Sequence, residues 1–210
     1  MKYCIENWKQ DIADAEKIVV GIGREFQTCD PGAAKEAYGA LGTLLNGRDY
    51  FVVSINTDDM IYRSGLDNHR IVCPCGSLDR LQCPDNCNDR IYSVKEVGAE
   101  PVCPDCGKPL VANTVDAACY NEHAYLEQWR AYTGWLQNTL HHKLVLLELG
   151  VGMDFPGVIH FPFEKMCLYN KQAILYRVNH SFSMIPEELV EKAYDIHENA
   201  VTFCRNAFVI

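Results

Sequence analysis

The stretch LVLLELGVG, residues 144–152, is a continuous apolar run that ends in two glycines. An apolar run of this length, bounded by turn residues, is typical of a strand buried on both faces of a parallel sheet. Apolar residues at helical spacing precede it over residues 125–140. The chain is therefore predicted to pass from a helix into a buried strand and then into a glycine turn.

The same order of helix, strand and turn recurs on both sides of this stretch. Alternation of strands with helices indicates a parallel sheet. We therefore predict an α/β fold, with a Rossmann-like parallel sheet and helices on both of its faces. The expected helices are residues 6–16, 33–45, 125–140 and 186–194, and the expected strands are residues 18–22, 51–55, 144–149 and 173–178.

Residues 71–116 do not continue the alternation of strands and helices, because they contain closely spaced cysteines, prolines and glycines. A segment of this composition has too few apolar residues to continue a helix-and-strand pattern, but it suits a small metal-braced unit. We therefore expect two parts. Residues 1–70 and 117–210 form a Rossmann-like nucleotide-binding domain, and residues 71–116 form an inserted, zinc-ribbon-like module.

Four cysteines of this segment have the spacing of a zinc site: Cys83, Cys87, Cys103 and Cys106. They form a C-x3-C and a C-x2-C pair, and each pair supplies two sulfurs from one tight turn. We predict that these four thiolates hold a structural zinc ion. Cys73, Cys75 and Cys119 are near enough in sequence to compete as ligands, and the alternative is a cluster of free or disulfide-bonded thiols.

Composition narrows the classes of function. The chain has 210 residues, 48% of them hydrophobic, and a formal charge of −9. An acidic chain without a basic run does not suit a nucleic-acid surface, because phosphate binding needs clustered Lys and Arg. No segment reaches eighteen uncharged apolar residues, and residues 1–10 lack the apolar core of an export signal. We expect a cytoplasmic protein that binds neither nucleic acid nor membrane.

Glycines and polar side chains follow several of the predicted strands. In a parallel sheet, ligands bind beyond the carboxyl ends of the strands, where bare backbone approaches a phosphate. We therefore predict a nucleotide site there. Without further context, Asn56 and Asp58 would equally suit an Asx turn, and glycines after strands often only make turns. The predicted rim consists of Gly21, Gly23, Asn56, Asp58, Gly150 and Gly152.

The order of these motifs resembles the core of the sirtuin family. Gly21-Ile22-Gly23, Asn56-Thr57-Asp58, the four-cysteine module, the stretch ELGVG at 148–152 and Val178-Asn179 are similar to sirtuin motifs in the same order. The stretch LELGVGMDFPGVIHFPFE, residues 147–164, is most similar to the bacterial macrodomain-linked sirtuins, a branch associated with protein ADP-ribosylation more than with deacetylation.

The resemblance implies cleavage of the nicotinamide–ribose bond of NAD. It implies that Asn56 and Asp58 hold the ribose and the amide, as the catalytic residues. Gly21 and Gly23 would approach the pyrophosphate, and Gly150 and Gly152 would flank a ribose. Asn179 would bind the adenosine hydroxyls. The zinc would be structural, because four thiolates leave no open position for water.

Three departures from the sirtuin pattern bear on the activity. Cys75 stands where sirtuins carry the general-base histidine, and an ordinary thiol is a poor base for a ribose hydroxyl. Arg24 and Glu25 replace the expected serine, which would place an acidic group near the diphosphate. The chain between Phe26 and Tyr50 is too short for the usual cofactor loop and the helical lobe that covers NAD.

Two hypotheses follow. In the first, the chain is an NAD-dependent enzyme that transfers ADP-ribose, or removes acyl groups, with NAD or ADP-ribose and a protein substrate as partners. In the second, it is a catalytically inactive, zinc-braced module that binds nucleotides or other proteins, since the usual base and cofactor loop are missing. Either hypothesis is compatible with an oligomer.

Overall fold

The computed structural model describes residues 3–208 and contains two sheets. The larger has six strands in the order β3-β2-β1-β7-β8-β9, all parallel. This is the doubly wound order, in which the strand sequence reverses between β1 and β7. The predicted parallel sheet is confirmed. Its strands are β1 (Lys17–Ile22), β2 (Tyr50–Ser54), β3 (Ile71–Val72), β7 (Leu144–Leu149), β8 (Ala173–Val178) and β9 (Ala193–Ile196).

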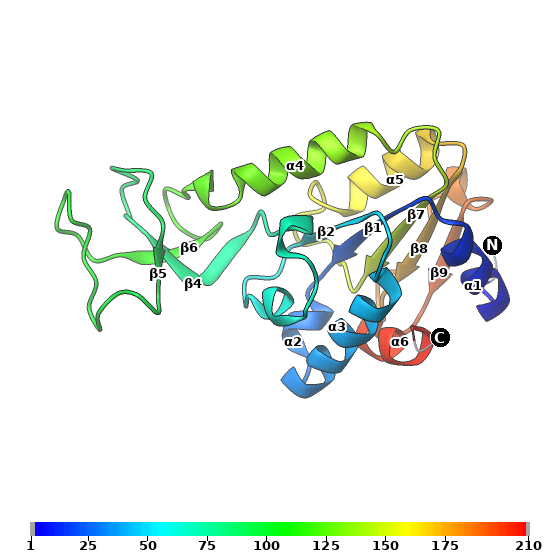
Figure 1. The fold of residues 1–210 in the computed structure, drawn as a ribbon, viewed down its shortest axis with the longest axis horizontal. Helices are drawn as coiled ribbons and strands as arrows, with labels where there is room; N and C mark the ends of the chain where they lie inside the picture. Colours follow the sequence, from blue (N-terminus) through cyan, green and yellow to red (C-terminus); the bar gives the residue numbers. More distant parts are fainter. Residues whose placement is uncertain (1–2, 209–210) are drawn as a thin grey trace.

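Helices cover both faces of this sheet, as the sequence predicted (Figure 1). One face packs against α4 (Leu126–Gln137) and α5 (His160–Tyr169). The other packs against α1, α2, α3 and α6. These helices span Ile5–Asp14, Glu25–Thr28, Pro31–Leu45 and Ala200–Ala207 in that order. Short 3-10 helices connect the elements: η1 (Met60–Arg63), η2 (Asn68–Arg70), η3 (Glu122–Ala124) and η4 (Glu187–Leu189).

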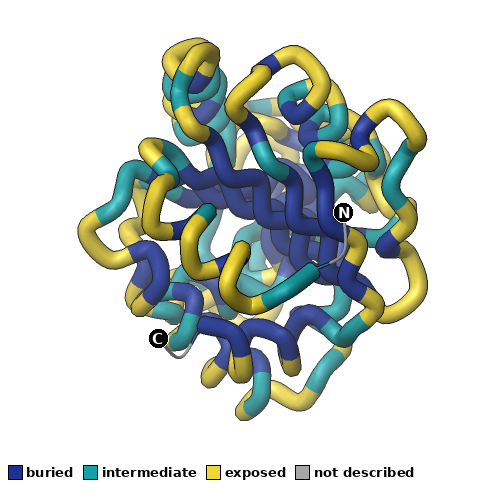
Figure 2. The backbone as a smooth tube through the Cα atoms, turned by 90° about the vertical axis from the view of Figure 1, so that its right-hand side faces the viewer, coloured by how far each residue is buried: buried dark blue, intermediate teal, exposed yellow. Residues whose placement is uncertain are grey.

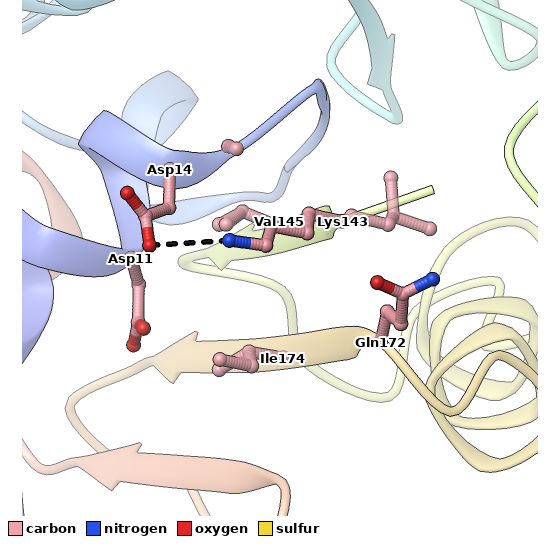
Figure 3. Close-up of a pocket in the computed structure, with 8 residues that line it drawn as sticks. Asp11, Asp14, Lys143, Val145, Gln172 and Ile174 are labelled. Atoms are coloured by element: carbon pink, nitrogen blue, oxygen red, sulfur yellow. Dashed lines mark hydrogen bonds and ion pairs between the residues drawn. The ribbon is translucent and has the colours of Figure 1, made fainter. Parts of the chain in front are cut away.

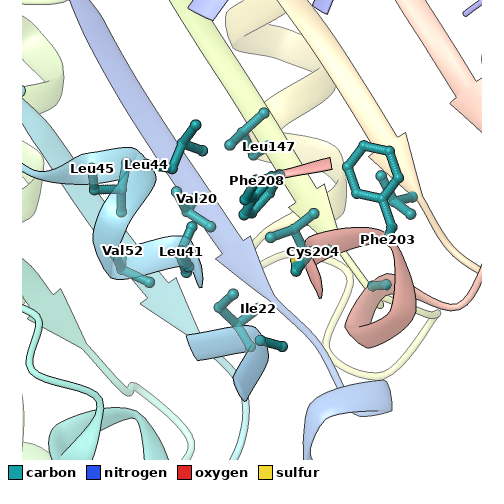
Figure 4. Close-up of a cluster of buried hydrophobic side chains, with 14 of the residues drawn as sticks. Val20, Ile22, Leu41, Leu44, Leu45, Val52, Leu147, Phe203, Cys204 and Phe208 are labelled. Atoms are coloured by element: carbon teal, nitrogen blue, oxygen red, sulfur yellow. The ribbon is translucent and has the colours of Figure 1, made fainter. Parts of the chain in front are cut away.

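The sheet is buried between the two helical layers, and the exposed backbone lies in the outer loops and helix surfaces (Figure 2). Side chains of β1, β2 and β7, such as Val20, Val52 and Leu147, point toward α3 and α6 (Figure 4). Each large apolar side chain buried in this way contributes about 1.5–3 kcal/mol to folding. The long apolar runs of the sequence therefore account for the central strands.

Local signals set the helix ends. Asp30 caps α3, because its carboxylate accepts a hydrogen bond from the Ala33 N–H at 3.0 Å. Pro31 follows at the first helical position, where its missing N–H costs nothing. The helix therefore begins two residues before the predicted start at residue 33.

The predicted helix at residues 186–194 is wrong. Only η4, a single 3-10 turn, forms there, and the chain then enters strand β9. Tyr194 and Ile196 are buried in this strand, and the Leu175 N–H of β8 donates to the Lys192 carbonyl at 2.9 Å. The outer edge of β8 offers a hydrogen-bonded position that helix signals in the local sequence do not reveal.

The smaller sheet is antiparallel and belongs to the cysteine-rich segment. It consists of β4 (Gly76–Gln82), β5 (Tyr92–Ser93) and β6 (Val111–Thr114) in the order β5-β4-β6, and it projects from one end of the larger sheet (Figure 1). Ile71 and Val72, which the sequence analysis placed in the inserted module, instead pair with β2 in the larger sheet. The small sheet begins at Gly76. No helix within residues 3–208 is long and apolar enough to cross a membrane.

Candidate NAD site and four-cysteine cluster

The carboxyl ends of β1 and β7 meet at the point where the strand order reverses. The Gly23 N–H donates to the Leu149 carbonyl at 2.9 Å. A Cβ on Gly23 would lie 2.1 Å from the Gly150 carbonyl oxygen, and Gly150 itself has a φ of +65°. No other residue fits this contact without moving backbone. Gly23 and Gly150 therefore bring two strand ends into direct contact at the predicted rim.

Gly21 and Gly152 have different surroundings. Gly21 lies within β1, and a Cβ there would stand 2.3 Å from Ile159 and 3.1 Å from Phe163. Its lack of a side chain lets α5 pack on the sheet, so the protein fills the side where the sequence analysis expected a pyrophosphate. A Cβ on Gly152 would meet nothing within 4 Å among the described residues. Gly152 therefore faces open space at the rim.

Asn56 is hydrogen-bonded to the point where the ends of β1 and β7 meet. Its side chain is 3% exposed, and its Nδ2 donates to the Gly23 carbonyl at 3.0 Å. Its backbone N–H donates to the Ser54 hydroxyl at 3.2 Å. The Oδ1 atom is buried and accepts no hydrogen bond of standard geometry within residues 3–208, and the buried hydroxyl of Tyr38, which lies close to the Asn56 side chain, also has none. A buried acceptor without a donor costs about 1–3 kcal/mol, so this oxygen fits a ligand N–H or O–H.

Asp58 is half-buried and faces the side of α2 and α3. Its Oδ1 accepts a hydrogen bond from the Met60 N–H at 3.1 Å. Burial raises the pKa of the nearby Cys29 thiol, and the negative charges of Asp30 and then Asp58 add to the rise. A pocket of about 500 Å³ opens between α3 and η1; its walls, which include none of the predicted rim residues, are Pro31, Gly32, Lys35, Tyr38, Met60, Arg63 and Ser64. Asp58 thus forms the Asx turn that the sequence analysis named as its alternative role, and neither Asn56 nor Asp58 lines the pocket.

Asn179 lies at the end of β8 and is held by backbone groups. Its Nδ2 donates to the Val151 carbonyl at 3.0 Å, and its Oδ1 accepts from the Ser181 and Phe182 N–H groups at 2.7 and 2.8 Å. The side chain joins the turn after β7 to the turn after β8. The structure therefore places Asn179 beside Gly150 and Gly152, where the sequence analysis expected an adenosine-binding residue.

Glu25 lies at the rim, because a Cβ on Gly150 would stand 2.7 Å from the Glu25 Cβ and 3.3 Å from its Oε2. It accepts hydrogen bonds from the His180 N–H at 2.8 Å and the Ala200 N–H at 2.6 Å. His180 lies in the loop after β8, and Ala200 is the first residue of α6. The backbone N–H groups partly offset its charge. The repulsion between Glu25 and a diphosphate that the sequence suggested is therefore reduced by the fold.

Cys75, which the sequence analysis placed at the position of the sirtuin histidine, is 1% exposed. Burial raises the pKa of its thiol to about 11, although the positive charge of Arg24 opposes the shift. Asp116 and Asp154 add to the rise. The thiol is protonated at neutral pH, and it is a poor proton acceptor there.

The four predicted zinc ligands converge. The Sγ atoms of Cys83, Cys87, Cys103 and Cys106 all lie within 4.8 Å of one another. Each pair ends in a turn that adopts a left-handed backbone, at Asn86 (φ 50°) and Gly107 (φ 72°). Cys73, Cys75 and Cys119, the competing candidates, lie outside this group within the described chain.

The electrostatics of the cluster suit a cation. The pKa of Cys83 is lowered, and the main cause is the hydrogen bond that its sulfur accepts from the Cys87 N–H. At Cys103, desolvation opposes ionisation, but the Asp105 and Cys106 N–H groups lower the pKa to about 6. Hydrogen bonds with neighbouring sulfurs raise the pKa of Cys87. Four adjacent thiols cannot all ionise without a positive charge between them, so the donor set fits a zinc ion.

Sequence analysis missed a buried charged cluster beneath the rim. Glu148 of β7 and Arg177 of β8 are 0% and 1% exposed, and His160 and Glu164 of α5 contact them. A sequence signal existed, because each of two apolar strands carries one charged residue next to its last position. The prediction treated these strands as uniformly apolar.

A second pocket lies at the opposite edge of the sheet, at the amino ends of β7 and β8 (Figure 3). The ion pair between Lys143 and Asp14, at 3.3 Å, crosses it. Asp11, Gln172 and Ile174 also line it. It is remote from the strand ends that carry Asn56 and Gly150.

Comparison with solved structures identifies the fold. A structure of Sir2 with a p53 peptide and NAD+ superposes with a TM-score of 0.67 over 97% of this chain and 96% of that chain, at 16% identity. A complex of a Sir2 homolog with NAD superposes with a TM-score of 0.64 over 99% of this chain and 93% of that chain, at 14% identity. The chain has the sirtuin fold.

Curated relatives of this sirtuin-like chain carry names of one enzyme class. A "Protein ADP-ribosyltransferase" of Staphylococcus aureus is 24% identical over 189 residues, which cover 82% of this chain and 60% of that protein. A "Probable bifunctional ADP-ribose hydrolase/ADP-ribosyltransferase" of Fusarium oxysporum is 30% identical over 169 residues, covering 69% of this chain and 27% of that protein. The chain thus spans less than two thirds of either relative. No family model matches the chain.

Proposed function

We propose that this sirtuin-like chain binds NAD at the carboxyl edge of its larger sheet, cleaves the nicotinamide–ribose bond and transfers ADP-ribose to a protein. The observation that carries the proposal is the geometry at the reversal of the strand order, where the buried Asn56 side chain is hydrogen-bonded to Gly23 and Gly23 packs against Gly150. The sirtuin fold and the names of the curated relatives support the same class of reaction.

Residues at the rim have distinct tasks in this proposal. Cleavage leaves an electron-poor ribose, so the site has to hold the sugar and the departing amide in a fixed, polar setting. Asn56 offers its Oδ1 to a ribose hydroxyl or to the carboxamide N–H. Asp58 follows the same strand end and accepts a hydrogen bond from the N–H of Met60, a residue of the pocket between α3 and η1. Gly152 offers open backbone to the rest of the nucleotide, with Asn179 alongside, whereas Gly150 is buried against Glu25.

The state of Cys75 favours ADP-ribosyl transfer over deacylation. Sirtuin deacylation uses a histidine base at this position, whereas the Cys75 thiol has its pKa raised to about 11 by burial. A group that stays protonated at neutral pH does not activate a ribose hydroxyl efficiently. Transfer of ADP-ribose to an acceptor group that is already ionised, such as a carboxylate, releases neutral nicotinamide and no proton, so it requires no base at this position.

The four-cysteine cluster, we further propose, holds a structural zinc ion. Cys83, Cys87, Cys103 and Cys106 would bind it with their thiolates, and the ion would neutralise them and fix the module's two turns. With all four positions occupied by sulfur, no position remains for substrate.

A second function, favoured by the protonated Cys75 and by the short connection between β1 and α3, is nucleotide binding without turnover. The chain passes from β1 through α2 to α3 between Ile22 and Pro31, so no separate lobe covers the rim on this side. In this form the chain would bind NAD or ADP-ribose and present the complex to a partner.

Release of nicotinamide separates these functions. We expect zinc-loaded protein to release nicotinamide from NAD, with Asn56→Ala lowering the rate by at least about 100-fold, the usual effect of removing a group that stabilises a transition state. Asn138→Ala, a substitution of an exposed asparagine after α4, should keep the wild-type rate. Binding of NAD without release would support the second function, and full activity of Asn56→Ala would contradict the proposed site.

A further inference from the structure

Four charged or ionisable side chains form a closed network beneath the rim. Arg177 donates from Nε to Glu148 Oε1 at 3.0 Å and from Nη2 to Glu148 Oε2 at 3.1 Å. Its Nη1 and Nη2 also lie 3.1 Å from Glu164 Oε1. The His160 ring lies 2.9 Å from Glu148 through Nδ1 and 3.4 Å from Glu164 through Nε2. Glu148 and Arg177 are register partners on neighbouring strands.

Stability alone does not explain this network. Removing two charges from water costs several kcal/mol per ion, and apolar residues of similar volume often stabilise a core equally well. The face of the sheet around Glu148 and Arg177 is otherwise apolar, with Leu146, Leu175 and Phe163 packed on it. A fork-to-fork pair in such a setting fixes geometry, because both partners have only one well-satisfied arrangement.

The network connects the two loops of the rim. Glu148 lies two residues before Gly150, and Arg177 lies two residues before Asn179. Arg177 Nη1 also donates to the Met184 carbonyl at 2.7 Å, which holds the loop after β8. His160 begins α5, directly after the loop that follows β7. One guanidinium therefore contacts β7, α5 and the β8 loop at once.

We propose that Glu148 and Arg177 are positioning residues, which hold the loops after β7 and β8 (residues 150–159 and 179–186) in the arrangement that receives a nucleotide. The ligand part rests on the proposed function, whereas the ordering of the loops is a property of the free protein. Neither residue touches the ligand. They act through Gly150, Asn179 and the backbone of Met184.

The test replaces the network and measures the loops directly. Glu148→Met combined with Arg177→Met removes both buried charges together, so that the core stays apolar and folded; Glu148→Gln leaves Arg177 only partly paired. Hydrogen exchange followed by mass spectrometry should show amides of residues 150–159 and 179–186 exchanging at least about tenfold faster in both variants. Amides in the middle of β1, β7 and β8 should keep their protection.

A matched control uses another ion-pair cluster of the same sheet. Asp49, at the amino end of β2, pairs with Lys17 at 2.5 Å and with Arg70 at 3.1 Å. Asp49→Asn should leave exchange in the two rim loops at the wild-type rate. Equal loosening of the rim by Asp49→Asn would mean that any lost ion pair has this effect, and it would overturn the proposal.

Titration with ADP-ribose then reports the consequence for binding. The double methionine variant should bind ADP-ribose about tenfold or more weakly than wild type, because loop ordering has to be restored on binding. Unchanged loop exchange in the folded double variant overturns the proposal, as does unchanged affinity for ADP-ribose. If the wild-type protein binds no ADP-ribose, the proposed function fails, and the exchange measurement on the free protein still decides the role of Glu148 and Arg177.

Discussion

Gly23 and Gly152 were both expected to lie against the nucleotide, but they have opposite surroundings in the structure. A Cβ on Gly23 would collide with the Gly150 carbonyl at 2.1 Å, whereas a Cβ on Gly152 would meet nothing within 4 Å among the described residues. We predict that Gly23→Ala lowers the free energy of unfolding by about 2–3 kcal/mol or more. Gly152→Ala should change it by less than about 0.5 kcal/mol. Denaturant unfolding of both variants measures this, and equal stabilities would contradict the contact between the strand ends.

Because several thiols are buried, the free energy of unfolding should depend on pH in the alkaline range. Burial raises the pKa of Cys75 to about 11, of Cys167 to about 11 and of Cys73 to about 12. An unfolded chain would release these protons near pH 8.5, before the folded chain does. Stabilisation from these protonated thiols is therefore present below about pH 8.5 and lost as pH rises toward 11, by at most about 2–3 kcal/mol per thiol.

Denaturant unfolding between pH 8 and pH 10.5 checks this dependence. The free energy of unfolding should fall across the range, and Cys75→Ala should fall less steeply than wild type. A slope that Cys75→Ala leaves unchanged would contradict the burial of this thiol, and with it the reason for doubting Cys75 as a base.

At the scale of elements, the cysteine-rich module is joined to the larger domain but has its own sheet. Its strands β4, β5 and β6 pair with one another, and the larger sheet has its own core on both faces. We predict that Cys103→Ser lowers bound zinc and unfolds residues 76–114 locally. Cys119→Ser should keep the metal, because Cys119 lies outside the cluster.

Metal analysis and hydrogen exchange of the two cysteine variants measure these effects. Exchange should accelerate in the module and stay slow in β1 and β7. A Cys103→Ser protein with its full zinc content and an ordered module would rule out the four-cysteine site.

Several elements could be predicted from the sequence because their signals are local. Strands β7 and β8 have the predicted bounds, since continuous apolar runs between turn residues have few alternative structures. Strand β9 was missed because its place beside β8 depends on an edge that only the folded sheet creates. Strand β3 is two residues long and carries too little pattern to be seen.

Part of the candidate site could also be predicted from the sequence. Spacing was enough to select the four cysteines, because ligand pairs have to come from tight turns. Asn56 and Gly150 follow strands that could be recognised, so their position at one edge followed from the parallel sheet. Gly21 was assigned to the ligand because sequence does not show which side of a strand a helix covers. Arg177 and His160 were missed because their partners are distant in the sequence.

At the scale of the whole molecule, two pockets in different parts of the structure are candidates for the nucleotide site. One lies between the start of α3 and η1, the elements that follow β1 and β2 in the chain. The other, between α1 and the amino ends of β7 and β8, is crossed by the ion pair of Lys143 and Asp14 (Figure 3). The doubly wound strand order favours the carboxyl edge, at the reversal between β1 and β7.

Hydrogen exchange of the zinc-loaded protein with and without ADP-ribose distinguishes the two edges directly. Exchange should slow in residues 23–27, 56–60, 150–154 and 179–182, and it should stay unchanged in residues 11–15 and 172–174 at the amino edge. Protection at the amino edge, or no protection anywhere at millimolar ADP-ribose, would contradict a nucleotide site at the meeting point of β1 and β7.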